Sequence, residues 1–153
     1  MKDNKLCGFD FIPKTSEVQH RTVYFSGKTN ALIEDVVSTR NDIGLQVSPN
    51  SKSYLKRHSP FSAIMVDNGA FGSDGFNHNK FIGMLNWINE NPMVKEKISF
   101  VVAPDVIENP IATLGLAEYW LPVIRQMGFK VAFVAQDGIE NMQYEIPYNE
   151  FDV

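Results

Sequence analysis

The chain has 153 residues, of which 44% are hydrophobic and 21% charged, and it carries a net charge of -4. This length suffices for one domain with a buried core, and the composition is that of a globular rather than a disordered protein. The acidic balance argues against a large basic face for nucleic acid, and we interpret the basic run Lys52, Lys56, Arg57 and His58 as a solvated helix face.

Apolar runs and helical periodicities then alternate along the chain. Strands are predicted at 22–27, 43–49, 62–69, 98–105 and 130–138, and helices at 30–39, 51–58, 77–91 and 109–127. The last helix has the clearest signals, because Asn109 and Pro110 form a typical start and Gly128 a typical end. Its predicted buried stripe consists of Leu114, Ala117, Leu121 and Ile124.

Alternating strands and helices predict parallel strands joined by right-handed crossovers. Both an open doubly wound sheet and a TIM-type barrel fit this α/β pattern. The segment FSGKTN after the first strand lacks the spacing of a Walker phosphate-binding loop. Without a phosphate-binding loop after the first strand, the commonest function of open sheets is excluded, and the barrel is favoured.

The last residues, FDV, resemble the beginning of a sixth strand. Five or six strands do not close a (β/α)8 barrel of about 250 residues. The sequence therefore predicts that residues 1–153 form a single domain. This domain would be the N-terminal part of a barrel, incomplete by itself, that a longer protein would complete.

Polar residues follow three consecutive strands. Asp67 and Asn68 end the third, Asp105 the fourth, and Gln136 and Asp137 the fifth. Because sites in parallel α/β folds lie at the carboxyl ends of strands, we expect the three acids Asp67, Asp105 and Asp137 to converge on one mouth. Each pattern is also a common turn sequence, and Asp137 equally fits a turn before Gly138.

Few other residues indicate chemistry. The single cysteine, Cys7, excludes an intrachain disulfide and a cysteine-based zinc site, and His20, His58 and His78 lack ligand spacing and are expected at the surface. The N-terminus has no signal-peptide core, and no apolar run of about 20 residues exists. We therefore expect a cytoplasmic protein without a membrane partner. The aromatics Phe71, Phe76 and Trp87 could stack a flat base, although the helical spacing of Trp87 favours a place in the core.

Four segments together resemble the deoxypurine-in-DNA protein A family, which is similar to tRNA-guanine transglycosylases. They are VDNGAF at 66–71, VVAPDV at 101–106, FVAQDG at 133–138 and IPYNEFDV at 146–153, and YFSGKTN at 24–30 fits the family's first strand and loop. The resemblance implies a TIM-type barrel that exchanges guanine for a queuine-type 7-deazaguanine in DNA or tRNA. Such proteins would suit a bacterial or phage modification cluster.

The resemblance also implies roles for individual residues. Asp67 matches an aspartate that lies beside base and sugar, and Asp105 matches one that binds the N–H edge of the base. Gln136 and Gly138 match a Gln-Gly-Gly motif that reads the base, where Asp137 departs from it. The predicted site thus comprises catalytic Asp67 and the substrate-binding residues Asn68, Gly69, Phe71, Asp105, Gln136, Asp137 and Gly138. Asn68 and Ala70 depart from the tRNA-type Asp-Ser-Gly-Gly-Phe pattern, which favours the DNA-acting branch.

The resemblance places the covalent aspartate nucleophile and any zinc site beyond Val153, so no metal or cofactor is expected in this segment. In the implied reaction, a carboxylate attacks the anomeric carbon, guanine leaves, and the new base attacks from the vacated side. Two alternatives stay open: a hydrolase of small glycosides or nucleosides that uses Asp67 and Asp105 as an acid pair, and a catalytically incomplete protein that only binds a base or a protein partner.

Overall fold

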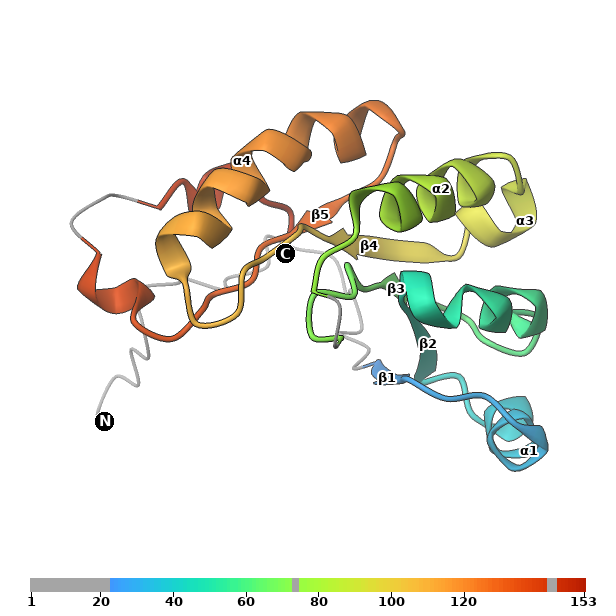
Figure 1. The fold of residues 1–153 in the computed structure, drawn as a ribbon. Helices are drawn as coiled ribbons and strands as arrows, with labels where there is room; N and C mark the ends of the chain where they lie inside the picture. The colour runs from blue at the N-terminus through green and yellow to red at the C-terminus, as the bar shows by residue number, and fades with distance from the viewer. Residues whose placement is uncertain (1–22, 73–74, 143–145) are drawn as a thin grey trace, which may run out of the picture.

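The computed structural model of the protein describes residues 23–72, 75–142 and 146–153. It contains one sheet of five parallel strands in the order β1-β2-β3-β4-β5. The strands are β1 (Tyr24–Ser26), β2 (Ile43–Val47), β3 (Ile64–Val66), β4 (Ile98–Val102) and β5 (Val131–Ala132). Figure 1 shows the helices as an outer layer along one side of this sheet, from α4 round to α1. The predicted parallel α/β fold is confirmed; residue 22 of the first predicted strand, Cys7 and His20 lie outside the described residues.

The helices begin and end close to the predicted positions. They are α1 (Ala31–Thr39), η1 (Pro49–Arg57), α2 (His78–Asn89), α3 (Pro92–Lys95), α4 (Pro110–Gln126), η2 (Ile139–Asn141) and η3 (Tyr148–Glu150). Asn30, Asn77 and Asn109 cap α1, α2 and α4, each accepting a backbone N–H with its side chain. The segment predicted as a helix at 51–58 is instead the 3-10 helix η1, because Ser51 (φ -111°, ψ 19°) interrupts regular helical geometry.

The main core lies between the sheet and its helices. Alternate strand residues face it, and Leu45, Val47, Ile64, Val66, Val101 and Val131 are fully buried there. One prediction about α4 is wrong: Leu114 is only half-buried, while Trp120 and Thr113 are buried. Trp120 packs edge-to-face on Phe81 with ring centroids 5.2 Å apart, which rotates the buried stripe of α4 toward α2.

The opposite face of the sheet is concave. Phe25 on β1 and Phe100 on β4 make an edge-to-face contact with ring centroids 5.8 Å apart. In a flat sheet these strands would lie three spacings, about 14 Å, from each other. Gly44 on β2 makes this contact possible, because a Cβ there would lie 2.6 Å from the Phe25 ring.

The last residues run alongside β5. Val153 donates a backbone hydrogen bond to Val131 and accepts one from Phe133, which is the pattern of a parallel ladder. The carboxylate of Asp152 accepts hydrogen bonds from the Val131 backbone (2.9 Å) and from Arg125 (3.3 Å). These bonds lower the pKa of Asp152, the Val131 N–H contributing most. The sequence segment predicted to begin a sixth strand therefore pairs at the edge of the sheet.

Within residues 23–72, 75–142 and 146–153, no helix combines the length and apolar character needed to cross a membrane.

Candidate functional site

The carboxylate of Asp105 links the ends of three strands. It follows β4, and its Oδ1 accepts a hydrogen bond from Asn68 Nδ2, after β3, at 2.7 Å. Its Oδ2 accepts one from Gln136 Nε2, after β5, at 2.5 Å. Asn68, Asp105 and Gln136 thus meet at the carboxyl edge of the sheet, with Asp105 at the centre. Of the three acids expected to converge, Asp67 lies beside this cluster and Asp137 does not join it.

Asn68 is a buried connector with 2% of its surface exposed. Besides the bond to Asp105, its Nδ2 donates to the backbone carbonyl of Ala103 at 2.7 Å, and its Oδ1 accepts from Ala70 N–H at 2.7 Å. Gly69 between them has φ +80°, and a Cβ there would lie 3.0 Å from Pro49, so the turn requires glycine. These bonds indicate that Asn68 orients Asp105 rather than touching a substrate.

Asp67 lies beside this cluster and has a different environment. Its backbone N–H donates to the Val47 carbonyl at 2.7 Å, which continues the β2–β3 ladder by one residue. Burial raises the pKa of Asp67 above its ordinary value, and the negative charge of Asp105 adds to this rise. Hydrogen bonds from the backbone of Asn68 and Gly69, and from the Gln46 side chain, oppose it. Asp67 is therefore the acid of this edge with a raised affinity for a proton.

The side-chain oxygen of Gln136 is held by a strained loop. Its Oε1 accepts the backbone N–H of Glu108 at 3.0 Å. Among the described residues, Glu108 is the one non-glycine residue with a positive φ, at 58°. This conformation costs a side-chain-bearing residue about 1 kcal/mol or more and clusters at functional sites. The loop after β4 thus fixes the amide that donates to Asp105.

Two supporting residues escape sequence reasoning. Thr113, buried in α4, accepts from the Val106 N–H (2.9 Å) and donates to the Val106 carbonyl (3.0 Å), which fixes the loop directly after Asp105. Gln46 lies on the concave face of β2 beside Asp67. A sequence signal exists for both residues, because each is a polar residue within an otherwise apolar stretch of the sequence.

Other predicted site residues do not join the cluster. Phe71 is 88% exposed, and Asp137 is exposed without a hydrogen bond or ion pair to another described residue. Gly138, with φ +86°, starts the 3-10 helix η2. Phe76, considered for base stacking, instead packs edge-to-face on Phe81 and Trp120 with centroids 5.5 and 5.7 Å apart, so it belongs to the core.

No group of three or more histidine, cysteine or acidic side chains that could hold a metal ion occurs in the described part of the chain. Comparison with models of protein families, with curated proteins and with solved structures gives no match. The proposed function therefore rests on the geometry at the carboxyl edge of the sheet.

Proposed function

We propose that the carboxyl edge of this sheet binds a purine-type base and serves its exchange in a polynucleotide, guanine for a 7-deazaguanine in DNA. The observation that carries the proposal is the chain of hydrogen bonds from Asn68 through Asp105 to Gln136. A carboxylate accepts hydrogen bonds from the N–H edge of a guanine-type base, and an amide complements its carbonyl. The two groups lie side by side here.

The order of the strands favours a TIM-type barrel over an open doubly wound sheet. A doubly wound sheet reverses its strand order at a switch point, whereas here the five strands follow one another in sequence order. Five strands in this order, with the helices on one side and a concave opposite face, correspond to the first part of a barrel wall.

The geometry fits base recognition better than an acid pair for hydrolysis. A general acid or base has to exchange a proton with the substrate. Both oxygens of Asp105 accept hydrogen bonds from neutral amides, so this side chain is arranged as a fixed acceptor. Asp67, with its raised pKa and its place at the end of β3, is the group suited to proton transfer.

In the proposed reaction, a carboxylate forms a bond to the anomeric carbon as the bond to guanine breaks, and the incoming base then displaces the carboxylate. Asp105 and Gln136 hold the base edge, and Asp67 lies beside base and sugar. The family resemblance assigns the nucleophile to a later strand. We therefore assign base recognition to the described residues, and binding of the free base tests this part of the proposal.

The decisive experiment measures binding of guanine and of a 7-deazaguanine to this chain by calorimetry. Loss of a hydrogen bond to a charged group costs about 1.5–3 kcal/mol, or roughly a 10- to 150-fold loss of affinity. We expect a loss of this size for Asp105→Asn, whereas Asp67→Asn should largely retain base binding. Glu118→Gln, an exposed acid on α4, is the matched control.

Absence of base binding by the unmodified chain would refute the proposal. Release of free sugar from small nucleosides without polynucleotide would instead identify a hydrolase.

A further inference from the structure

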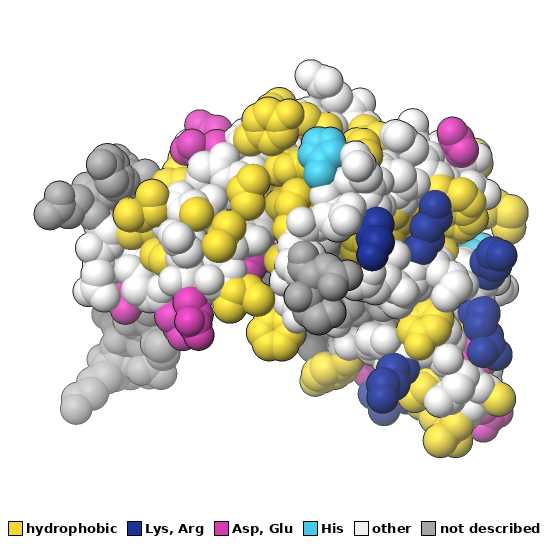
Figure 2. Space-filling view, viewed as in Figure 1, with side chains coloured by type: hydrophobic (Ala, Val, Ile, Leu, Met, Phe, Trp, Pro, Cys, Tyr) yellow, Lys and Arg dark blue, Asp and Glu magenta, His cyan; other side chains and the backbone are white. Residues whose placement is uncertain are grey.

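The outer helices carry a basic groove that the proposed site does not use. Between Asp42 and Asp67 the sequence has three basic residues, Lys52, Lys56 and Arg57, and no acidic one. Figure 2 shows lysine and arginine side chains over η1 and α2, with acidic side chains over the α4 part of the molecule and at the edges of the basic region. A protein with net charge -4 thus presents a local surface of the opposite sign.

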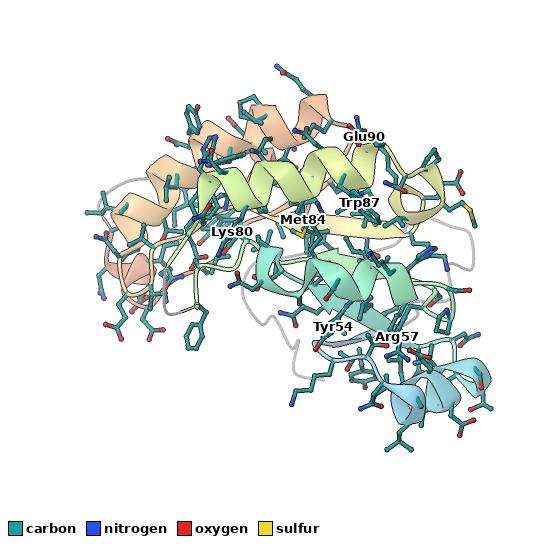
Figure 3. All side chains as sticks on the ribbon, turned by 45° about the vertical axis from the view of Figure 1, so that its right-hand side comes forward. Tyr54, Arg57, Lys80, Met84, Trp87 and Glu90 are labelled. Atoms are coloured by element: carbon teal, nitrogen blue, oxygen red, sulfur yellow. The ribbon has the colours of Figure 1, made fainter. Side chains whose placement is uncertain are left out.

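The groove lies between η1 and the pair α2 and α3. It has a volume of about 380 Å³, and its lining includes Leu55, Lys56, Trp87, Asn91 and Met93. Figure 3 shows Met84 and Trp87 of α2 along the seam that faces η1. The groove thus combines a half-buried indole, apolar side chains and a lysine.

Cations lie along the groove. Lys52 Nζ lies 5.6 Å from the centroid of the Trp87 ring and 3.3 Å from the Gly83 carbonyl. Lys56 is exposed one helical turn further along η1. Arg57 beyond it forms an ion pair with Glu34 at 2.7 Å, so the net positive charge of the groove rests on the two lysines.

A second, separate hollow lies at the other end of the seam between η1 and α2, next to the candidate site. Lys80 Nζ lies 3.5 Å from Asn50 Oδ1, which connects the first turn of α2 to the start of η1. Asn50 and Lys80 also line this small hollow together with Asn68 and Gly69. The basic surface therefore begins at the carboxyl edge of the sheet, where the base would be held.

We propose that this groove binds the single-stranded DNA that flanks the exchanged base. The inference rests on the proposed function, in which the base is held at the carboxyl edge of the sheet. An exchanged base has to leave the stack, so its neighbours run as a single strand. Folds that bind single strands combine cations for phosphates with aromatic rings for bases. Lys52, Lys56 and Lys80 contact phosphates, and Trp87 with Met93 provides the apolar wall for a neighbouring base.

The test uses oligothymidylate about 16 nucleotides long, at the upper end of site sizes for single-strand binders. It contains no guanine, so it measures strand binding independently of base exchange. Fluorescence anisotropy gives the affinity as a function of salt for the unmodified chain and two double variants. Lys52→Gln/Lys56→Gln removes two groove charges, and Lys28→Gln/Lys130→Gln removes two exposed charges from the segments after β1 and before β5, which do not form the groove.

We expect the groove variant to lower the slope of log affinity against log salt by about 1.4, or about 0.7 for each lost phosphate contact, and the control variant to leave it unchanged. Equal losses in both variants would reduce the effect to overall charge and overturn the proposal. Failure of the unmodified chain to bind the oligonucleotide at low salt while base binding persists would also overturn it. Binding with the expected slopes but without binding of the free base would keep the groove and refute the proposed function.

Discussion

Replacement of Asn68 by alanine is the sharpest test of how the candidate site is built. The substitution removes three hydrogen bonds of 2.7 Å from a side chain that is 2% exposed, and one of them ends on the Asp105 carboxylate. Two neutral bonds contribute about 1 kcal/mol each and the charged one about 1.5–3 kcal/mol. Asn68→Ala should therefore lower the free energy of unfolding by about 3.5–5 kcal/mol, and the Tm by roughly 10 °C.

Urea unfolding, followed by circular dichroism, measures this loss. Asn86→Ala, at an exposed position of α2, is the matched control and should change the stability by less than about 0.5 kcal/mol. A double-mutant cycle with Asp105→Ala then isolates the contact between the two side chains, and we expect a coupling energy of about 1.5 kcal/mol or more. A loss below about 1 kcal/mol for Asn68→Ala, or additive effects in the cycle, would refute the idea that Asn68 orients Asp105.

Three further predictions concern residues around the site and the core. Because the pKa of Asp67 is raised in the folded state, its carboxyl costs no stability below the ordinary value of 3.8 and an increasing amount as pH rises through the raised value. Asp67→Asn should therefore gain stability relative to the unmodified chain between about pH 3 and pH 7, and a constant difference in urea titrations would contradict this. Gly44→Ala should cost about 1–3 kcal/mol in the same assay, because the new Cβ meets the Phe25 ring at 2.6 Å; a neutral effect would show that this ring moves freely. Lys97 Nζ donates to the carbonyls of Ser59 and Phe61, both at 2.9 Å, so Lys97→Met should cost about 2 kcal/mol; an unchanged urea midpoint would exclude that role.

The sequence was sufficient for the elements whose signals are local. Asparagine caps and a proline at the first helical position located the start of α4, and continuous apolar runs located β4 and β5. The buried stripe of α4 was not predictable in the same way, because it depends on contacts with α2. Trp120 packs on Phe81 of α2, whereas Leu114 is only half-buried. Periodicity gives the existence of a buried stripe, and tertiary packing sets its rotation about the helix axis.

The same division holds for the candidate site. Strand ends are readable from sequence, so the meeting of Asp105 with Gln136 could be expected from parallel topology. The role of Asn68 could not, because the direction of its side chain depends on the positive φ of Gly69 and on the approach of Pro49. Asp137, adjacent to Gln136 in sequence, is exposed, because it lies in the turn that leads through Gly138 into η2.

The order of the strands also explains why net charge was a poor guide to the surface. When strands follow one another in sequence order, each sequence segment occupies its own sector of the molecule. The basic stretch between Asp42 and Asp67 therefore lies in one sector, and the described part of residues 98–153, with seven acidic and two basic residues, lies in another. A doubly wound sheet, which places its strands out of sequence order, would bring such segments together and mix their charges. In this fold the charge of a segment is more informative than the charge of the chain, which is why a polyanion-binding groove is compatible with a net charge of -4.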